Sequence, residues 1–125
     1  MRLNQVTVIV TDINRSVEFY RGLGLMQIVS ADSRYARFLC PDGDATFSIE
    51  KKPGVIPQST TIIYFECDNL DDTVSELKSK GYVFDRDPID QSWLWREAYL
   101  RDPDGNIICL YYAGENRINP PWRLK

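Results

Sequence analysis

Residues 4–25 read NQVTVIVTDINRSVEFYRGLGL, and the hydrophobic period changes part-way along this stretch. At first Val6, Val8 and Val10 alternate with other side chains, which is the period of a strand. Apolar and small residues then recur at helical spacing, at Ile13, Val17, Tyr20 and Gly24. The stretch therefore predicts a strand followed directly by a helix.

Residues 60–81, TTIIYFECDNLDDTVSELKSKG, repeat this pattern. Ile63, Phe65 and Cys67 alternate as in a strand. The four helical positions of the first copy reappear 57 residues later, as Leu70, Val74, Leu77 and Gly81. A match in both the change of period and the register indicates an internal duplication.

Three further strands are expected after each helix, and PDGD and PDGN turns at 41–44 and 103–106 close the last hairpin of each half. The first helix is predicted to have Asn14 as its N-cap and to stop at Gly22. The expected strands run over residues 26–31, 34–40 and 45–51 in the first half, and 82–86, 93–101 and 107–112 in the second.

We therefore predict an α+β fold in which two tandem βαβββ modules form a cup-like half-barrel of mixed sheet, with the helices on the outer face. The expected organisation is a single domain over residues 1–125. Repeat 1 covers about 3–52 and repeat 2 about 60–113, followed by a polar C-terminal tail at 114–125. Pro and Gly in KKPGVIPQS, residues 51–59, mark the linker.

Composition excludes several classes of function. The net charge of −3 and pI near 4.9 argue against nucleic-acid binding, which needs clustered positive charge. The chain has no apolar run of about 18 residues and no signal-peptide pattern, so we expect no membrane partner and a cytoplasmic location.

It has no histidine, which excludes Ser-His-Asp hydrolysis and every His-ligated metal site. Its three cysteines are odd in number and widely spaced, as expected of reduced thiols.

The sheet face opposite the helices is predicted to be aromatic and polar, which suits a ligand cavity. The alternative is an exposed sheet face with ordinary cross-strand pairs. By alternation this face carries Gln5, Thr7, Tyr35, Arg37, Thr46, Ser48, Glu50, Ile62, Tyr64, Glu66, Trp95, Glu97, Tyr99, Arg101, Cys109 and Tyr111.

The duplicated βαβββ pattern, the V-x-D-I-N-R-S-V-E-F-Y entry to the first helix and R-D-P-D-G-N before the last strand resemble the vicinal oxygen chelate superfamily. That superfamily includes glyoxalase I, extradiol dioxygenases, and fosfomycin and bleomycin resistance proteins. The resemblance covers about residues 3–113. The resemblance is strong evidence for the fold and weak evidence for the function, because the fold hosts unrelated chemistries. It also implies a homodimer.

In metal-dependent members, the resemblance implies ligands at the positions of Gln5, Ser48, Ile62 and Cys109. Gln5 is a permissible ligand, whereas Ile62 has no donor atom and Ser48 is a poor ligand for a divalent ion. Glu50 lies two residues beyond Ser48 on the same face and is an alternative at that position. Cys109 stands where such members carry a glutamate. We therefore predict no metal and no cofactor.

Two features of the predicted face favour a planar or anionic ligand. If the PDGD hairpin closes as expected, Arg37 lies across from Ser48 and provides a fixed guanidinium. The alternative is that Arg37 pairs with Glu50 or Glu97. Trp93 and Trp95 are predicted to share one strand face and to stack on a planar ligand, with core packing or a dimer contact as the alternative.

The preferred hypothesis is a metal-free, cytoplasmic, homodimeric protein, close in character to bleomycin resistance proteins, that captures a planar aromatic or anionic small molecule. The alternative is a lyase or isomerase of the glyoxalase type, or another small-molecule enzyme, with Glu50, Glu66 or Glu97 as base. Extradiol dioxygenase chemistry is disfavoured by the absence of histidine. A purely structural role is the third possibility. The predicted ligand-binding residues are Gln5, Arg37, Ser48, Tyr64, Trp93, Trp95, Tyr99, Cys109 and Tyr111.

Overall fold

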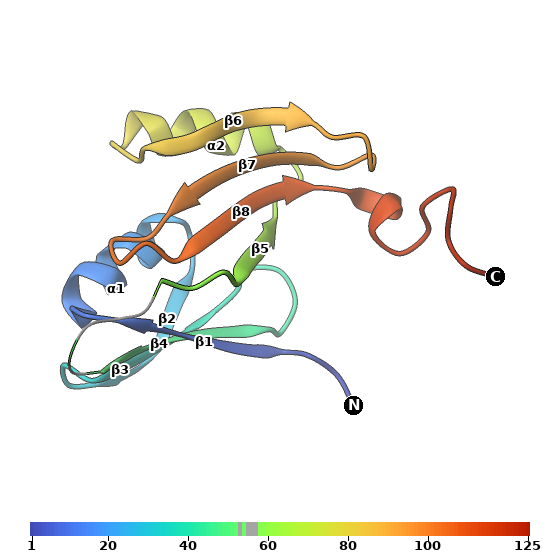
Figure 1. Ribbon diagram of the computed structural model, residues 1–125. Coiled ribbons are helices and arrows are strands. Elements are labelled where there is room, and N and C mark those ends of the chain that lie inside the picture. The colour runs from blue at the N-terminus through green and yellow to red at the C-terminus, as the bar shows by residue number, and fades with distance from the viewer. Residues whose placement is uncertain (53, 55–57) are drawn as a thin grey trace. The chain divides into compact units, whose positions relative to one another are not determined.

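The structure of the chain is a computed structural model that describes residues 1–52, 54 and 58–125 (Figure 1). Part of the predicted linker, Pro53 and residues 55–57, lies outside the described residues. The first module consists of β1 (Gln5–Val10), α1 (Ile13–Gly22), β2 (Met26–Ala31), β3 (Tyr35–Leu39) and β4 (Thr46–Lys51). The second consists of β5 (Ile62–Glu66), α2 (Leu70–Ser79), β6 (Phe84–Asp90), β7 (Arg96–Arg101) and β8 (Ile107–Tyr112), followed by the short 3₁₀ helix η1 (Gly114–Arg117).

Each module builds one open, mixed, four-stranded sheet with the same topology. The strand orders are β1-β4-β3-β2 and β5-β8-β7-β6. In both sheets the first strand runs parallel to the last, while the other neighbours are antiparallel. The predicted α+β fold with tandem βαβββ modules is confirmed.

Both helices bury most of the predicted apolar positions, because those side chains recur on one face, although Val17 of α1 is only half-buried and Ser16 beside it is fully buried. Ile13 and Tyr20 of α1 are buried, as are Leu70, Val74 and Leu77 of α2. The first core is largely aromatic, since the Tyr20 ring centroid lies 4.6 Å from that of Phe47 and 6.1 Å from that of Phe38. The second core is aliphatic, with Leu100, Ile108 and Leu110 buried on the strands.

The predicted N-cap of α1 is wrong by two residues. Asp12 has the extended backbone of an N-cap, and its carboxylate accepts a hydrogen bond from the Arg15 backbone N–H at 3.0 Å. Asn14 already lies within the first turn. The matching residue of the second module, Asn69, stands at the N-cap of α2. The predicted end of α1 at Gly22 is confirmed.

Two strand boundaries of the second module also differ from the prediction. β6 covers residues 84–90 rather than 82–86, and β7 begins at Arg96 rather than at Trp93. Residues 91–95 form a tight turn instead. The Gln91 backbone N–H donates to the Trp95 carbonyl at 2.7 Å, and Leu94 has a positive φ of 68° that interrupts an extended strand.

The chain divides into two compact units that do not coincide fully with the repeats. The first unit comprises residues 1–59 together with the β7–β8 turn, Asp102–Asn106. Within this unit the Tyr20 hydroxyl, on a fully buried side chain, donates to Asp102 Oδ2 at 2.7 Å. Asp102 Oδ1 accepts the backbone N–H groups of Asp104 and Asn106, each at 2.9 Å. Burial, and next the charge of Asp102, raise the pKa of Tyr20, which keeps its proton for this bond.

Within the described residues, no helix is long and apolar enough to cross a membrane. Each of the two α-helices has 10 residues.

We expect Tyr20→Phe to lower the free energy of unfolding by about 1.5–3 kcal/mol, because a hydrogen bond to a buried carboxylate is lost. Tyr112→Phe is the matched control, since the exposed Tyr112 hydroxyl has no recorded partner among the described residues. The control is expected to change stability by less than about 0.5 kcal/mol. Urea denaturation of both variants measures the difference, and equal effects would contradict the importance of the Tyr20–Asp102 bond.

Candidate functional site

A polar network crosses the open face of the first sheet, and Ser48 lies at its centre. Ser48 is fully buried on β4, and its Oγ accepts a hydrogen bond from Gln5 Nε2 of β1 at 2.8 Å. The Tyr35 hydroxyl of β3 lies 2.7 Å from the same Oγ. Arg37 Nε in turn donates to the Tyr35 hydroxyl at 2.9 Å. We call Gln5, Tyr35, Arg37 and Ser48 the Ser48 network.

The β3–β4 register places Arg37 directly opposite Ser48, as predicted. The link between them is Tyr35, which sequence reasoning left out of the site although it shares the alternation of Arg37. The predicted alternative, an ion pair of Arg37 with Glu50, is not formed in the described part of the chain. Glu97 belongs to the other unit. Arg37 is half-buried, and only its Nε has a recorded hydrogen-bond partner among the described residues, so its terminal nitrogens can bind an oxygen-bearing ligand.

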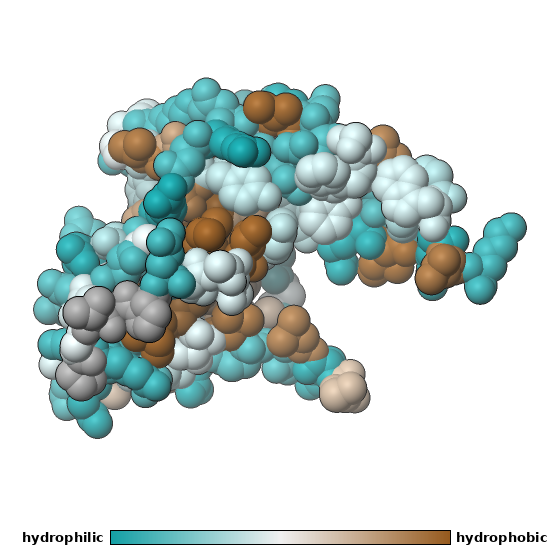
Figure 2. Space-filling model, in the orientation of Figure 1, coloured by the Kyte–Doolittle hydropathy of each residue, from teal (hydrophilic) through white to brown (hydrophobic). Residues whose placement is uncertain are grey.

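An aromatic cluster occupies the corresponding face of the second sheet. The Trp95 and Tyr111 rings are stacked with centroids 4.8 Å apart. Tyr64 meets both edge-on, at 6.0 Å from Trp95 and 5.5 Å from Tyr111. Cys109 and the partly buried Ile62 and Tyr99 pack against this group. We call Tyr64, Trp95 and Tyr111 the aromatic cluster. In Figure 2, pale side chains of intermediate hydropathy gather where β7 begins and β8 ends.

Glu97 lies on the same strand face and is only 3% exposed. It stands opposite Tyr111 in the β7–β8 register. Its Oε1 accepts a hydrogen bond from the Tyr99 hydroxyl at 3.1 Å, and its Oε2 accepts one from Trp93 Nε1 at 3.0 Å. Burial, followed by the charges of Cys109 and Glu97, raises the pKa of Tyr99, so Tyr99 remains a donor.

Trp93 and Trp95 do not share a strand, which corrects the prediction. Both precede β7 and belong to the turn over residues 91–95. Trp95 belongs to the aromatic cluster, and its Nε1 donates to the Asn116 carbonyl at 3.4 Å. Trp93 is half-exposed and reaches Glu97. The bond between Trp93 and Glu97 was not predicted, because it depends on the turn.

The three candidate bases differ in what they already bind. Glu66 Oε2 accepts the backbone N–H groups of Ala113 and Gly114, each at 2.9 Å, and Arg117 lies 3.9 Å from its Oε1. Glu66 therefore holds the start of the C-terminal tail. Glu97 is buried beneath its two donors, whereas Glu50 is partly exposed on β4 and has no recorded partner among the described residues.

The residues at the four metal-ligand positions do not fit a divalent metal. Ser48 Oγ is buried and already hydrogen-bonded, and Gln5 directs its N–H₂ at it while its Oε1 accepts the Thr46 hydroxyl. Ile62 has no donor atom. Burial, and next the charge of Glu97, raise the pKa of Cys109 to about 12, so the thiolate that binds metals is not formed near neutral pH. No group of three His, Cys, Asp or Glu residues is placed to hold a metal in the described part of the chain.

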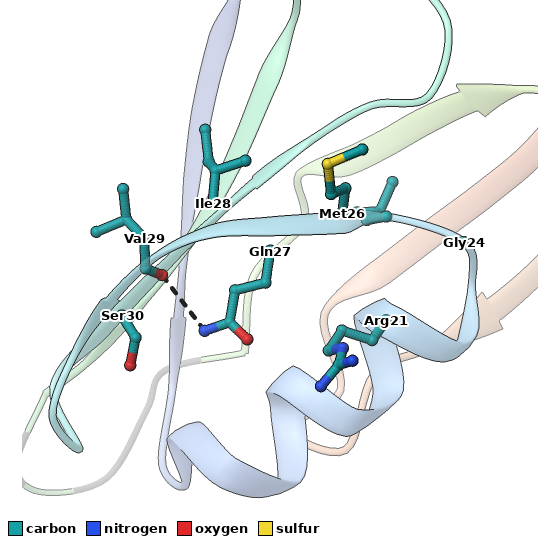
Figure 3. Close-up of a pocket in the computed structure, with 8 residues that line it drawn as sticks. Arg21, Gly24, Met26, Gln27, Ile28, Val29 and Ser30 are labelled. Atoms are coloured by element: carbon teal, nitrogen blue, oxygen red, sulfur yellow. Dashed lines mark hydrogen bonds between the residues drawn. The ribbon is translucent and has the colours of Figure 1, made fainter.

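A groove of about 690 Å³ lies between α1 and the edge strand β2, and none of the predicted site residues lines it (Figure 3). Arg21 faces it from α1, and Gln27 points toward the helix, while Ile28 points away. Gln27 Nε2 donates to the Val29 carbonyl at 3.3 Å, beside an irregularity in the β2–β3 pairing. No sequence pattern predicts this groove.

Comparisons with known proteins agree with the fold. The family model of the Glyoxalase/Bleomycin resistance protein/Dioxygenase superfamily matches residues 2–110. The chain belongs to this superfamily.

Two relatives come from Bacillus subtilis (strain 168). The uncharacterized protein YraH is 32% identical over 125 residues, covering 89% of this chain and 98% of its own length. A probable trivalent organoarsenical cleaving enzyme is 24% identical over 121 residues, covering 93% and 83%. Among solved structures, a glyoxalase/bleomycin resistance protein/dioxygenase from Nocardioides superposes with a TM-score of 0.77 at 19% identity, covering 100% of this chain and 90% of its own. That likeness shows the fold alone.

We expect the purified protein to carry no stoichiometric metal. Ile62 has no donor atom, the Cys109 thiol is protonated, and Gln5 and Ser48 are already hydrogen-bonded to each other. Elemental analysis of protein prepared without chelators measures this. One Zn, Ni, Fe or Mn per chain, lost in Gln5→Ala and kept in the matched control Gln91→Ala, would contradict the expectation.

Proposed function

We propose that this protein is a metal-free small-molecule-binding protein of its superfamily that captures planar aromatic or anionic ligands. The observation that carries the proposal is the arrangement of Arg37. Its guanidinium is held by Tyr35 and leaves terminal donors without a recorded partner among the described residues. A guanidinium fixed in this way recognises a carboxylate or carbonyl oxygen through charge-assisted hydrogen bonds.

The aromatic cluster, in the second unit, is a separate surface that suits planar ligands. Tyr64 is 43% exposed and stands edge-on to the stacked pair of Trp95 and Tyr111, so an aromatic surface is open to contact. Aromatic rings gain from stacking beyond the area that they bury. Gln5, Ser48, Tyr99 and Cys109 then support these contact residues rather than a metal. We also propose a cytoplasmic location, consistent with the composition.

A second candidate is a lyase or isomerase that uses a carboxylate as base. It is favoured by Glu50, which follows the Ser48 network along β4 and has no recorded partner among the described residues. A base beside a fixed guanidinium suits proton abstraction next to a carbonyl. Turnover that Glu50→Gln abolishes would favour this candidate over pure binding.

We expect Arg37→Ala to weaken the binding of an aromatic acid such as 2-naphthoate by about 1.5–3 kcal/mol, the scale of a charge-assisted hydrogen bond. Binding at the aromatic cluster of the second unit should quench tryptophan fluorescence, and Trp95→Ala should weaken binding there. Arg34→Ala is the matched control, because it removes the same charge from the exposed β2–β3 turn of the same unit. The test is a fluorescence titration of the parent and the three variants. If a ligand binds equally to all four proteins, its site lies elsewhere.

We expect the protein to be a homodimer in solution, as members of the superfamily often are. Both sheets are open, and Trp122 and Leu124 of the tail are exposed at 56% and 92%. Light scattering at micromolar concentration measures the mass. A value near 14.5 kDa that does not depend on concentration would exclude the dimer.

A further inference from the structure

Glu97 is a buried carboxylate for which the described residues provide no cationic partner. It is 3% exposed, and none of the ion pairs in the described part of the chain includes it. Each of its two oxygens accepts a hydrogen bond from a neutral group, Tyr99 in one case and Trp93 in the other. An ionised carboxylate only accepts, so this arrangement matches the charged form.

Burying a charge that is solvated only by neutral donors costs free energy of folding. The second carboxylate on this face is satisfied differently. Glu66 accepts two backbone N–H groups and has Arg117 at 3.9 Å. Glu97 therefore differs from Glu66 in having no ion-pair partner among the described residues.

Aromatic side chains lie next to Glu97. Trp93 and Tyr99 bind Glu97 directly, and Tyr111 lies opposite it in the strand register. The stacked Trp95 and the edge-on Tyr64 extend the aromatic surface. Aromatic faces attract cations, most strongly where water is excluded. One cation already follows this attraction, because the Arg86 guanidinium carbon lies 6.0 Å from the Tyr99 ring centroid.

Of the two donors to Glu97, Trp93 is the more exposed. This side chain is 45% exposed and comes from the turn over residues 91–95, outside the sheet. The next residue, Leu94, holds a positive φ of 68°, a conformation that a leucine seldom adopts. The indole that covers Glu97 is therefore carried by a strained turn rather than by a strand, and its displacement breaks one hydrogen bond and no strand pairing.

We propose that Glu97 and the aromatic side chains around it form a binding site for a planar organic cation, a ligand with a quaternary or protonated ring nitrogen. The cation pairs with the carboxylate in place of the Trp93 indole and stacks on the aromatic cluster. The inference rests on the proposed function, small-molecule binding, and assigns the ligand charge that the second unit selects.

The test compares three probes of similar shape by calorimetric titration at pH 8. They are 1-methylquinolinium as the cation, quinoline as its neutral counterpart and 2-naphthoate as the anion. The parent protein is expected to bind 1-methylquinolinium at least tenfold more tightly than quinoline. Glu97→Gln keeps one of the two acceptor oxygens and removes the charge, so it is expected to abolish this preference. Glu66→Gln removes one charge from the same sheet face and is expected to keep it.

A measurement on the parent protein keeps the test valid if Glu97→Gln does not fold. The indole N–H resonance of Trp93, assigned by its loss in Trp93→Phe, is expected to shift with 1-methylquinolinium and not with quinoline. Equal affinity for the two probes, or equal effects of the two glutamine variants, would overturn the proposal. Binding of 2-naphthoate without 1-methylquinolinium overturns this inference and leaves the proposed function standing. The reverse result supports the cation site and refutes the Arg37 site.

Discussion

The structure depends on one geometric constraint: successive side chains of a strand point to opposite faces, and each sheet has a single helix to cover one of them. On β4, Phe47 and Ile49 are buried in the core, and Ser48 between them lies on the other face. On β7, Ala98 and Leu100 alternate in the same way with Glu97. The face without a helix is therefore the one free to carry polar chemistry, and both candidate surfaces lie there.

The fold could be predicted because the strand–helix pattern occurs twice in the sequence, and because the hydrophobic period indicates which residues face the helices. The boundaries that failed are those set by local hydrogen bonds. Asp12 and Asn14 are both good N-cap residues, and only the bond to the Arg15 N–H distinguishes them. β7 starts late because Leu94 turns the chain, and a leucine gives no sequence signal of a positive φ.

The part of the candidate site that depends on strand register could be predicted from the sequence. Cross-strand pairing places Arg37 opposite Ser48 and Glu97 opposite Tyr111, and alternation together with the predicted hairpin turns gives both pairs. Side-chain hydrogen bonds lie beyond register, since they depend on rotamers and on the path of loops. The Tyr35 bridge was missed for the first reason. The path of loops explains why the sequence also allowed Glu66 as a possible base. The position of the C-terminal tail that Glu66 binds does not follow from a sequence pattern.

The turn Asp102–Asn106 shows how far the two repeats have diverged. It belongs to the first unit although the second repeat encodes it, and it supplies the acceptor for Tyr20. The residue of the second repeat that matches Tyr20 is Leu77, and the residue of the first repeat that matches Asp102 is Cys40. This pair cannot make the same bond. The two repeats are therefore not equivalent at this turn. A fragment holding only the first repeat lacks the acceptor for Tyr20 and does not encode a complete first unit.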